Sequence, residues 1–121
     1  SNSLVMILEA KGLRILFTGD INSQSEYEMM KRGLDLKSDI LKVPHHGADD
    51  ATTQDFLVYI LPKVGIITAG TNNPWGYPTA EVLERLKKKS IQIYRTDKNG
   101  DILVKIYNRA RFRIFPLQNL D

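Results

Sequence analysis

The sequence predicts an α/β fold, in which a mixed sheet carries about three helices on one side and a further layer on the other. Short apolar runs typical of strands alternate with segments whose apolar residues recur at helical spacing. The first two runs follow one another without a helix between them, and so do the last runs. Because the chain has 121 residues and 42% hydrophobic content, we expect residues 1–121 to form a single domain with its own core.

The first predicted elements are a β-hairpin and a helix. Residues 4–8 and 13–17 are apolar runs separated by a turn that contains glycine. Residues 23–26 (Ser-Gln-Ser-Glu) have the form of a capping box, in which the Ser and Glu side chains bind free amides at a helix start. We therefore expect a helix that begins at Ser23 and ends near Gly33.

The middle of the chain predicts two strands with a helix between them. Residues 39–43 are strand-like, and Pro44 prevents simple continuation of their ladder. Residues 53–61 place apolar side chains at helical spacing and stop before Pro62. Residues 64–69 form a nearly uninterrupted apolar run, as expected for a strand covered on both faces.

The last third predicts a helix and three strands. The helix begins at Pro78-Thr79, and the lysines at 87–89 are interpreted as its solvated end. Residues 91–94 predict a strand. Asn99-Gly100 is a strong hairpin signal, expected to join this strand to residues 102–107, with a final strand at 111–115.

Composition excludes several classes of protein. The chain has no cysteine, which rules out disulfides, Cys-ligated zinc and a thiol nucleophile. No apolar stretch approaches the roughly 18 residues needed to cross a bilayer. A net charge of +3 gives a mild preference for anionic partners, far below that of a dedicated nucleic-acid binder.

Asp20 and the His45-His46 pair directly follow two of the predicted strands. Ligands of open α/β sheets gather outside the carboxyl ends of the strands, so these side chains can meet there. Carboxylate and imidazole suit zinc, manganese or iron, and we expect one histidine to bind the metal and the other to touch substrate or support the site. The alternatives are a turn or helix-cap aspartate and two surface histidines. Two or three ligands predict only weak metal binding, and Asp49 and Asp50 are interpreted as residues of a solvated loop.

Two further features are candidates for substrate binding. Residues 72–78 (Asn-Asn-Pro-Trp-Gly-Tyr-Pro) predict either a substrate wall around a phosphate or base, with Asn73 and Tyr77 in it, or a packed loop over the sheet edge. Lys42 interrupts a strand that should be buried. It is expected either to meet an anion at the site or to pack its stem on apolar surface with its ammonium in water.

Arg109, Arg111 and Arg113 alternate with apolar residues, so one face of the last predicted strand is basic. Such a ladder can track phosphates. We favour the alternative that these arginines solvate an outer face and block edge pairing.

Several short motifs occur together in a fixed order. They are Asn2-Ser3-Leu4-Val5, Phe17-Thr18-Gly19-Asp20, Leu41-Lys42-Val43-Pro44-His45-His46-Gly47, Ala69-Gly70 with Asn72-Asn73 and Gly76-Tyr77-Pro78, and Arg95-Thr96-Asp97 with Gly100. From its first residues to about Val104, the chain thereby resembles the C-terminal part of the metallo-β-lactamase-like domain of ComEC-type competence proteins, which are bacterial DNA-uptake channel proteins.

The resemblance implies half of an αββα sandwich and a metal-dependent hydrolase of phosphodiester or ester bonds, with zinc or manganese as the metal. Asp20 would bridge metal ions, His46 would be a metal ligand, and His45 would act beside the substrate. The HxHxDH ligand cluster of the family is not in this sequence. We expect it upstream, and we expect the chain by itself to be inactive. Ala48 and Tyr77 stand where the family usually has Ser and His. We expect these two differences to affect how the site binds its substrate.

The resemblance also places the complete protein in the bacterial cytoplasmic membrane, with this domain soluble and extracytoplasmic and without membrane contact of its own. Its expected partners are DNA, single-stranded or duplex, and the rest of the same polypeptide. An uncovered sheet face further predicts a homodimer. Two other functions stay open: a stand-alone phosphoesterase of the same superfamily, and a non-catalytic module that guides single-stranded DNA.

Overall fold

The computed structural model describes residues 3–108 and 111–118 and confirms the α/β class. In these residues five strands form one mixed sheet, and two more form a separate antiparallel sheet. The strands are β1 (Met6–Ala10), β2 (Leu13–Phe17), β3 (Ile40–Lys42), β4 (Val64–Ile67), β5 (Gln92–Arg95), β6 (Ile102–Asn108) and β7 (Arg111–Pro116). The helices are α1 (Ser23–Lys31), α2 (Gln54–Ile60), α3 (Ala80–Lys88) and the short α4 (Thr96–Asn99), and Pro44–Gly47 form the turn η1.

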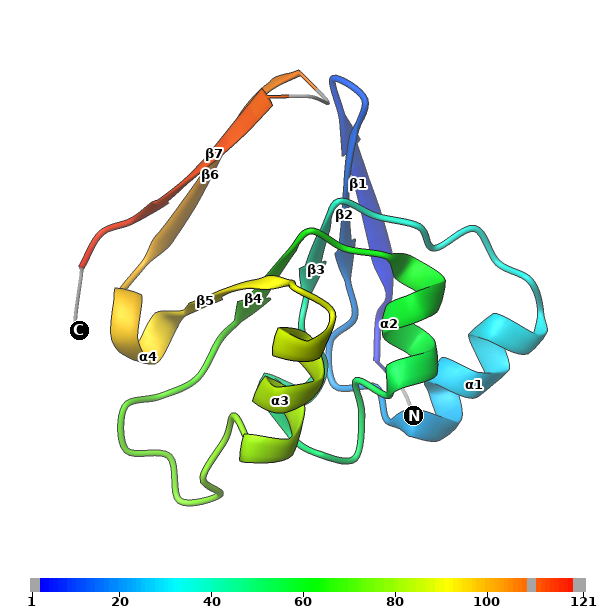
Figure 1. Cartoon of the computed structure of the whole chain (residues 1–121), viewed down its shortest axis with the longest axis horizontal. Helices are drawn as coiled ribbons and strands as arrows, with labels where there is room; N and C mark the ends of the chain where they lie inside the picture. Colours follow the sequence, from blue (N-terminus) through cyan, green and yellow to red (C-terminus); the bar gives the residue numbers. More distant parts are fainter. Residues whose placement is uncertain (1–2, 109–110, 119–121) are drawn as a thin grey trace.

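The large sheet has the strand order β1-β2-β3-β4-β5 (Figure 1). β1 and β2 pair antiparallel as the predicted hairpin, with Met6 opposite Phe17, whereas β2, β3, β4 and β5 run parallel. Parallel strands bring their carboxyl ends to one edge of a sheet. This edge therefore receives the segments that follow Phe17, Lys42 and Ile67.

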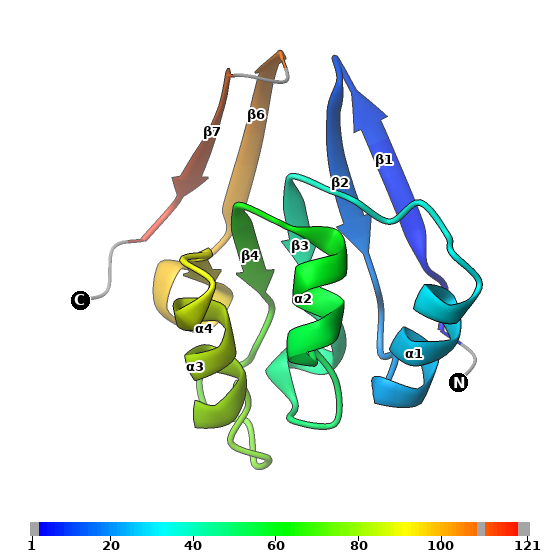
Figure 2. The ribbon, with the colours of Figure 1, turned by 45° about the vertical axis from the view of Figure 1, so that its right-hand side comes forward.

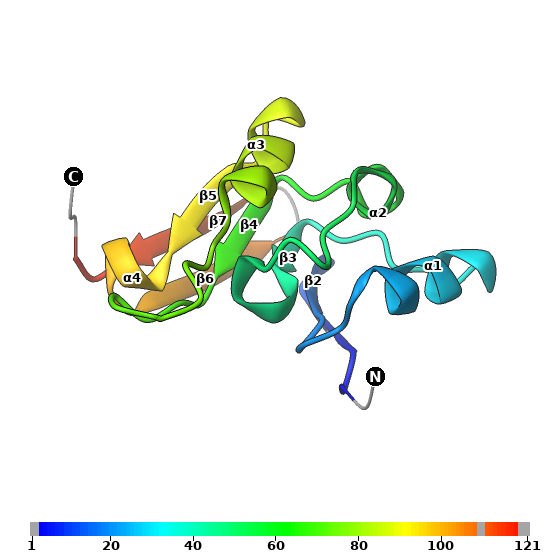
Figure 3. The same cartoon turned by 90° about the horizontal axis from the view of Figure 1, so that it is seen from below.

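Helices α1, α2 and α3 cover one face of the large sheet, as predicted (Figures 2 and 3). The core beneath them consists of fully buried side chains from helices and strands, among them Leu16, Leu41, Phe56, Leu57, Ile60, Ile67, Val82 and Leu86. Full burial of such a side chain contributes about 1.5–3 kcal/mol. This core holds the strand ends that carry the candidate site.

The β6–β7 hairpin lies on the other face and provides the further layer that the sequence predicts (Figure 1). Its inward side chains pack over the strands of the large sheet. The contacting residues are Val104, Ile106, Phe112 and Ile114 from the hairpin and Leu13, Ile15, Ile40 and Val64 from the sheet. A mainly apolar crevice of about 580 Å³ remains between the two layers.

The predicted tight hairpin at Asn99-Gly100 is wrong. Residues 96–99 form α4, and among the described strands β6 pairs with β7 and not with β5. Side-chain contacts stabilise the short helix here. Asn99 Oδ1 accepts a hydrogen bond from Arg95 N at 2.8 Å, and the Arg95 guanidinium forms two hydrogen bonds to the Asp97 carboxylate. These local bonds redirect the chain away from β5 and toward the second sheet.

The predicted capping box is displaced by one residue. Asn22 is the N-cap of α1, and its Oδ1 accepts a hydrogen bond from Ser25 N at 3.0 Å. Asparagine caps helices as well as serine does, and it precedes Ser23. Glu26 is consequently not a capping residue, and its carboxylate lies in the core.

Candidate functional site

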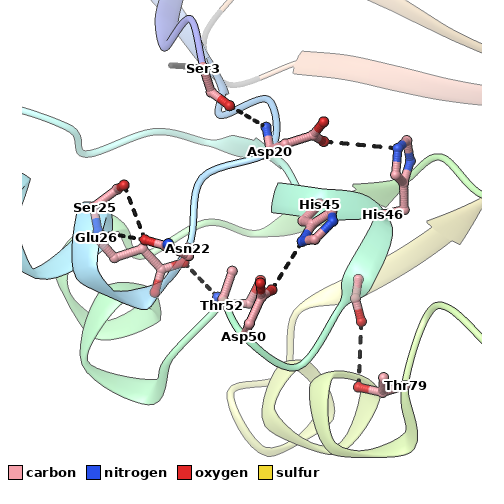
Figure 4. Close-up of polar contacts among 12 residues, drawn as sticks. Ser3, Asp20, Asn22, Ser25, Glu26, His45, His46, Asp50, Thr52 and Thr79 are labelled. Atoms are coloured by element: carbon pink, nitrogen blue, oxygen red, sulfur yellow. Dashed lines mark hydrogen bonds and ion pairs between the residues drawn. The ribbon is translucent and has the colours of Figure 1, made fainter. Parts of the chain in front are cut away.

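The carboxyl edge of the parallel strands brings Asp20 and His46 together, as the sequence predicts (Figure 4). Asp20 Oδ1 lies 3.9 Å from His46 Nε2. Ser3 Oγ accepts a hydrogen bond from the Asp20 amide at 3.1 Å and ties this turn to the start of the hairpin. The Asp20 and His46 side chains are 66% and 51% exposed, so ions and solvent can reach the Asp20 carboxylate and His46 Nε2.

The turn that carries the histidines has an unusual backbone. His45, His46 and Gly47 are all left-handed, with φ of 51°, 56° and 83°. This conformation costs about 1–2 kcal/mol for each residue other than glycine. The surroundings hold it in place, because the His45 amide donates to Gly19 O at 2.9 Å and the Thr79 amide donates to Gly47 O at 3.0 Å. Backbone strain maintained in this way is common at functional sites.

The hydrogen bonds of His46 determine which of its nitrogens is available. His46 Nδ1 lies 2.7 Å from Thr68 O, and a carbonyl oxygen can only accept, so Nδ1 carries the proton. In the neutral ring, Nε2 then has a free lone pair, and this atom lies next to Asp20. Ligand histidines are commonly fixed by a backbone carbonyl in this way.

His45 is held by a different partner. Its Nδ1 lies 3.1 Å from Asp50 Oδ1, and its ring meets the Tyr77 ring edge-on at 5.6 Å. The Ser23 amide donates to Asp50 O at 2.6 Å and fixes the backbone of that residue. Asp50, expected to belong to a solvated loop, therefore supports His45, and no pattern in the sequence indicates this pairing.

The loop between His45 and α2 is clamped by a buried carboxylate that sequence reasoning missed. Glu26 is fully buried, and its two oxygens accept hydrogen bonds from the amides of Thr52 at 2.5 Å and Thr53 at 3.0 Å. Arg85 donates to Ala51 O and Thr52 O from the other side. Burial raises the pKa of Glu26, while the two amide hydrogen bonds and the Arg85 charge act in the opposite direction.

Lys42 points into the crevice between the two layers. Its side chain lines this crevice together with Thr68 and Thr96. Burial lowers the pKa of Lys42, and the nearby Asp20 carboxylate opposes this shift. The two opposite charges attract one another, and a substrate-binding role for Lys42 stays a prediction.

The loop of residues 70–78 is fixed by the side chain of Asn73. Its Nδ2 donates to Gly70 O at 3.0 Å and to Tyr77 O at 2.7 Å, and its Oδ1 accepts from Tyr77 N at 2.8 Å. Both amide atoms are thus engaged within the loop. The substrate-binding role predicted for Asn73 and Tyr77 remains a prediction, in which Asn73 would act by shaping the loop.

The predicted arginine ladder lies on β7. Arg109 falls outside the residues that the structure describes. Arg111 and Arg113 are exposed, and their guanidinium groups lie over the rings of Tyr107 at 4.6 Å and Phe115 at 5.1 Å. These contacts fit an outer face of the small sheet that is covered by cation–π pairs.

Asp20 and His46 suit a divalent metal by their chemistry. Bonds of about 2.0–2.2 Å from a metal to oxygen and to nitrogen sum to roughly 4.2 Å, so atoms 3.9 Å apart can share one ion. Within residues 3–108 and 111–118, however, no group of three or more His, Asp or Glu side chains is arranged to hold a metal ion. Because a catalytic zinc normally has three protein ligands, Asp20 and His46 alone fall short of a zinc site, and their role as metal ligands stays a prediction.

Fold and site together define an α/β half sandwich with an Asp–His pair at the carboxyl edge of its parallel strands. The chain is similar to proteins of several bacteria. "ComE operon protein 3" of Bacillus subtilis is 38% identical over 96% of this chain, "Recombination protein 2" of Haemophilus influenzae 33% over 88%, and "Competence protein ComA" of Neisseria gonorrhoeae 31% over 81%. The chain is a homologue of one segment of the competence proteins of the ComEC type.

The match covers a small part of each relative. The chain spans 15%, 13% and 14% of the lengths of these three proteins. No model of a protein family matches the chain. In the part of the chain that the structure describes, no helix is long and apolar enough to cross a membrane.

Proposed function

We propose that this chain is the C-terminal part of a metal-dependent hydrolase domain of the metallo-β-lactamase type, acting on phosphodiester bonds of DNA within a competence protein. The observation that carries this proposal is the Asp20–His46 pair, whose facing atoms lie 3.9 Å apart. The contact from His46 Nδ1 to Thr68 O supports it, because it leaves Nε2 with the lone pair that a metal needs. Homology to proteins named for competence and recombination supports DNA as the substrate.

In this proposal Asp20 and His46 hold a divalent metal, zinc or manganese. When bound, such an ion supplies an activated water and offsets negative charge on the phosphate. His45 can take up a proton at Nε2, because its Nδ1 donates to the Asp50 carboxylate and leaves the lone pair on Nε2. Lys42 contributes a positive charge that is attracted to the Asp20 carboxylate.

The remaining ligands come from elsewhere in the complete protein. Two ligands bind a metal weakly, so the chain by itself is expected to show no turnover. We place the complete protein in the bacterial cytoplasmic membrane, with this domain outside it and DNA as its partner. The homology to ComEC-type competence proteins supports this arrangement.

Metal binding by the chain is tested by NMR of the isotopically labelled protein during titration with Mn²⁺, whose unpaired electrons broaden nearby signals. We expect broadening to begin at the amides of Gly19, Asp20 and His46, and to be lost there in Asp20→Asn and His46→Ala. Asp55→Asn removes an exposed carboxylate on α2 and should leave the pattern unchanged. Broadening centred on any other carboxylate group would contradict the assignment.

Hydrolysis is tested in a longer protein that includes the expected HxHxDH segment, with bis(p-nitrophenyl) phosphate as substrate. Asp20→Asn and His46→Ala should each lower kcat by about 100-fold or more, since supporting groups alone account for about 10–100-fold. Asp55→Asn again serves as the control. Unchanged turnover in His46→Ala would refute the proposed role of this residue.

A further inference from the structure

Two aromatic rings lie side by side at the candidate site. Trp75 is the only tryptophan in the sequence, and it is 70% exposed. Its ring stacks on that of Tyr77, with centroids 6.3 Å apart and an angle of 18° between the planes. Tyr77 in turn meets His45 edge-on. One broad face of an aromatic pair is thus directed to solvent beside the two histidines.

The loop that carries these rings is held firmly against the histidine turn. Asn73 makes three hydrogen bonds within the loop. Pro78 is buried against Gly47, where an added Cβ would lie 2.5 Å from Pro78 Cβ. A rigid aromatic surface loses little conformational entropy when a ligand binds to it.

A small hollow joins the rings to the candidate metal ligand. It has a volume of about 160 Å³ and is lined by His46, Ala69, Gly70, Asn73, Trp75 and Tyr77. At roughly 30 Å³ for each water molecule, it holds about five waters, well below the roughly 300–1,000 Å³ of pockets for larger ligands. A hollow of this size and lining suits one flat ring system.

We propose that Trp75 and Tyr77 form a stacking platform for one unpaired base of single-stranded DNA, in the hollow next to His46. The proposal rests on the proposed function, because it specifies the form of DNA that the same site takes. Stacking requires an exposed base face, which a duplex hides and a single strand offers. Since a base is linked through its sugar to a phosphate, a base in this hollow brings its phosphate close to His46.

Trp75 makes the proposal measurable without a label, because its fluorescence comes from this position alone. The chain is titrated with a thymidine oligonucleotide, with an abasic strand of the same length, and with a duplex. We expect saturable quenching with the oligonucleotide and affinity at least about five-fold lower for the other two, which corresponds to the low end of stacking on one base. Equal affinity for the abasic strand would overturn the proposal, since binding would then depend on phosphates alone.

Variants separate stacking from general attraction. By anisotropy of a labelled thymidine oligonucleotide, Trp75→Leu should weaken binding by about five-fold to 150-fold, the range for loss of one stacked base. Trp75→Phe keeps an aromatic ring and should retain most of the wild-type affinity. Tyr27→Leu removes an aromatic ring of 55% exposure on α1 and should have no effect. Unchanged affinity in Trp75→Leu would also overturn the proposal.

The two proposals fail in different ways. Quenching by single strands should persist in the presence of EDTA, because stacking needs no metal. If quenching occurs and the longer protein hydrolyses nothing, the platform stands and the hydrolase proposal fails. The opposite case is a longer protein that cleaves DNA. The platform is refuted if Trp75→Leu then leaves DNA binding unchanged and slows the cleavage of DNA no more than that of bis(p-nitrophenyl) phosphate.

Discussion

Glu26 is fully buried, although it lies on the first turn of an exposed helix, and it accepts hydrogen bonds from the amides of Thr52 and Thr53. Thr52 is a β-branched residue with φ of 60°, a conformation that it adopts only when its surroundings enforce it. Glu26 therefore holds the strained end of the loop whose other end contains Asp50, the partner of His45. A buried carboxylate thus positions the histidine without contacting it.

Removal of the Glu26 carboxylate should destabilise the chain. Glu26→Ala leaves the buried Thr52 amide and the partly buried Thr53 amide without an acceptor. Because a fully buried group without a partner costs about 1–3 kcal/mol and a partly buried one costs less, we expect a loss of about 2–4 kcal/mol in the free energy of unfolding. Glu26→Gln keeps one acceptor and should lose less. Urea unfolding measures both, and Glu28→Gln, on the same helix, is the matched control. A loss no larger than that of Glu28→Gln would contradict the clamp.

The same residue predicts a dependence on pH. Because burial raises the pKa of Glu26 above 4.5, the folded chain holds more protons than the unfolded chain between 4.5 and the raised value. The contribution of Glu26 to stability is then complete below pH 4.5 and decreases as pH rises through this window. The stability of the wild type relative to Glu26→Gln should accordingly fall with rising pH, and a rise would show that the hydrogen bonds outweigh burial.

Single residues differ in how far the sequence predicts them. The proximity of Asp20 and His46 could be predicted from the sequence, because both residues follow parallel strands and the carboxyl ends of such strands meet at one edge of the sheet. Glu26 could not, since its partners lie 26 and 27 residues away in an irregular loop. Its local pattern favoured a capping role, which tertiary contacts override.

At the scale of elements, the site depends on contact between two loops. Gly47, at the end of η1, has φ of 83° and lies against Pro78, which precedes α3. An added Cβ would lie 2.5 Å from Pro78 Cβ and 2.9 Å from Pro78 Cα. Because the second of these is a backbone atom, rotation of a side chain cannot relieve the clash.

Gly47→Ala should therefore separate the histidine turn from the aromatic loop. We expect destabilisation of about 2 kcal/mol or more, from left-handed strain together with the clash. Gly33→Ala is the matched control, because Gly33 also has a positive φ, 66°, but has nothing within 4 Å of an added Cβ. Urea unfolding gives the difference, and Trp75 emission reports movement of the loop. Equal losses in the two variants would show that the contact with Pro78 contributes nothing.

Helices and strands whose apolar residues recur at a regular spacing could be predicted from the sequence. The connection between the two sheets could not. Helices α2 and α3 begin where Thr53 and Thr79 cap them, close to the predicted starts. The segment from Arg95 to Asn99 was misassigned, since Asn99-Gly100 predicts a two-residue hairpin turn. The Arg95–Asp97 ion pair and the hydrogen bond from Arg95 N to the Asn99 side chain decide the conformation there, and their effect depends on geometry that spacing does not encode.

At the scale of the whole molecule, the two layers leave apolar surface uncovered. β1 is the outermost strand at one end of the large sheet, and on it Met6 and Leu8 are 50% and 49% exposed. Leu8 also lines the crevice between the sheets. An exposed apolar edge strand promotes pairing with another chain, which fits the expectation of a homodimer.

Leu8→Lys should weaken self-association of the chain. Sedimentation velocity over a range of protein concentrations should show a monomer–dimer equilibrium in the wild type that shifts toward monomer in the variant, because a charge on an edge strand opposes pairing. Stability should change little, since Leu8 is already half exposed. Val58→Lys places the same charge at an equally exposed apolar position on α2 and should leave the equilibrium unchanged. Monomer at every concentration, or an equal effect of Val58→Lys, would exclude β1 and the crevice as the contact.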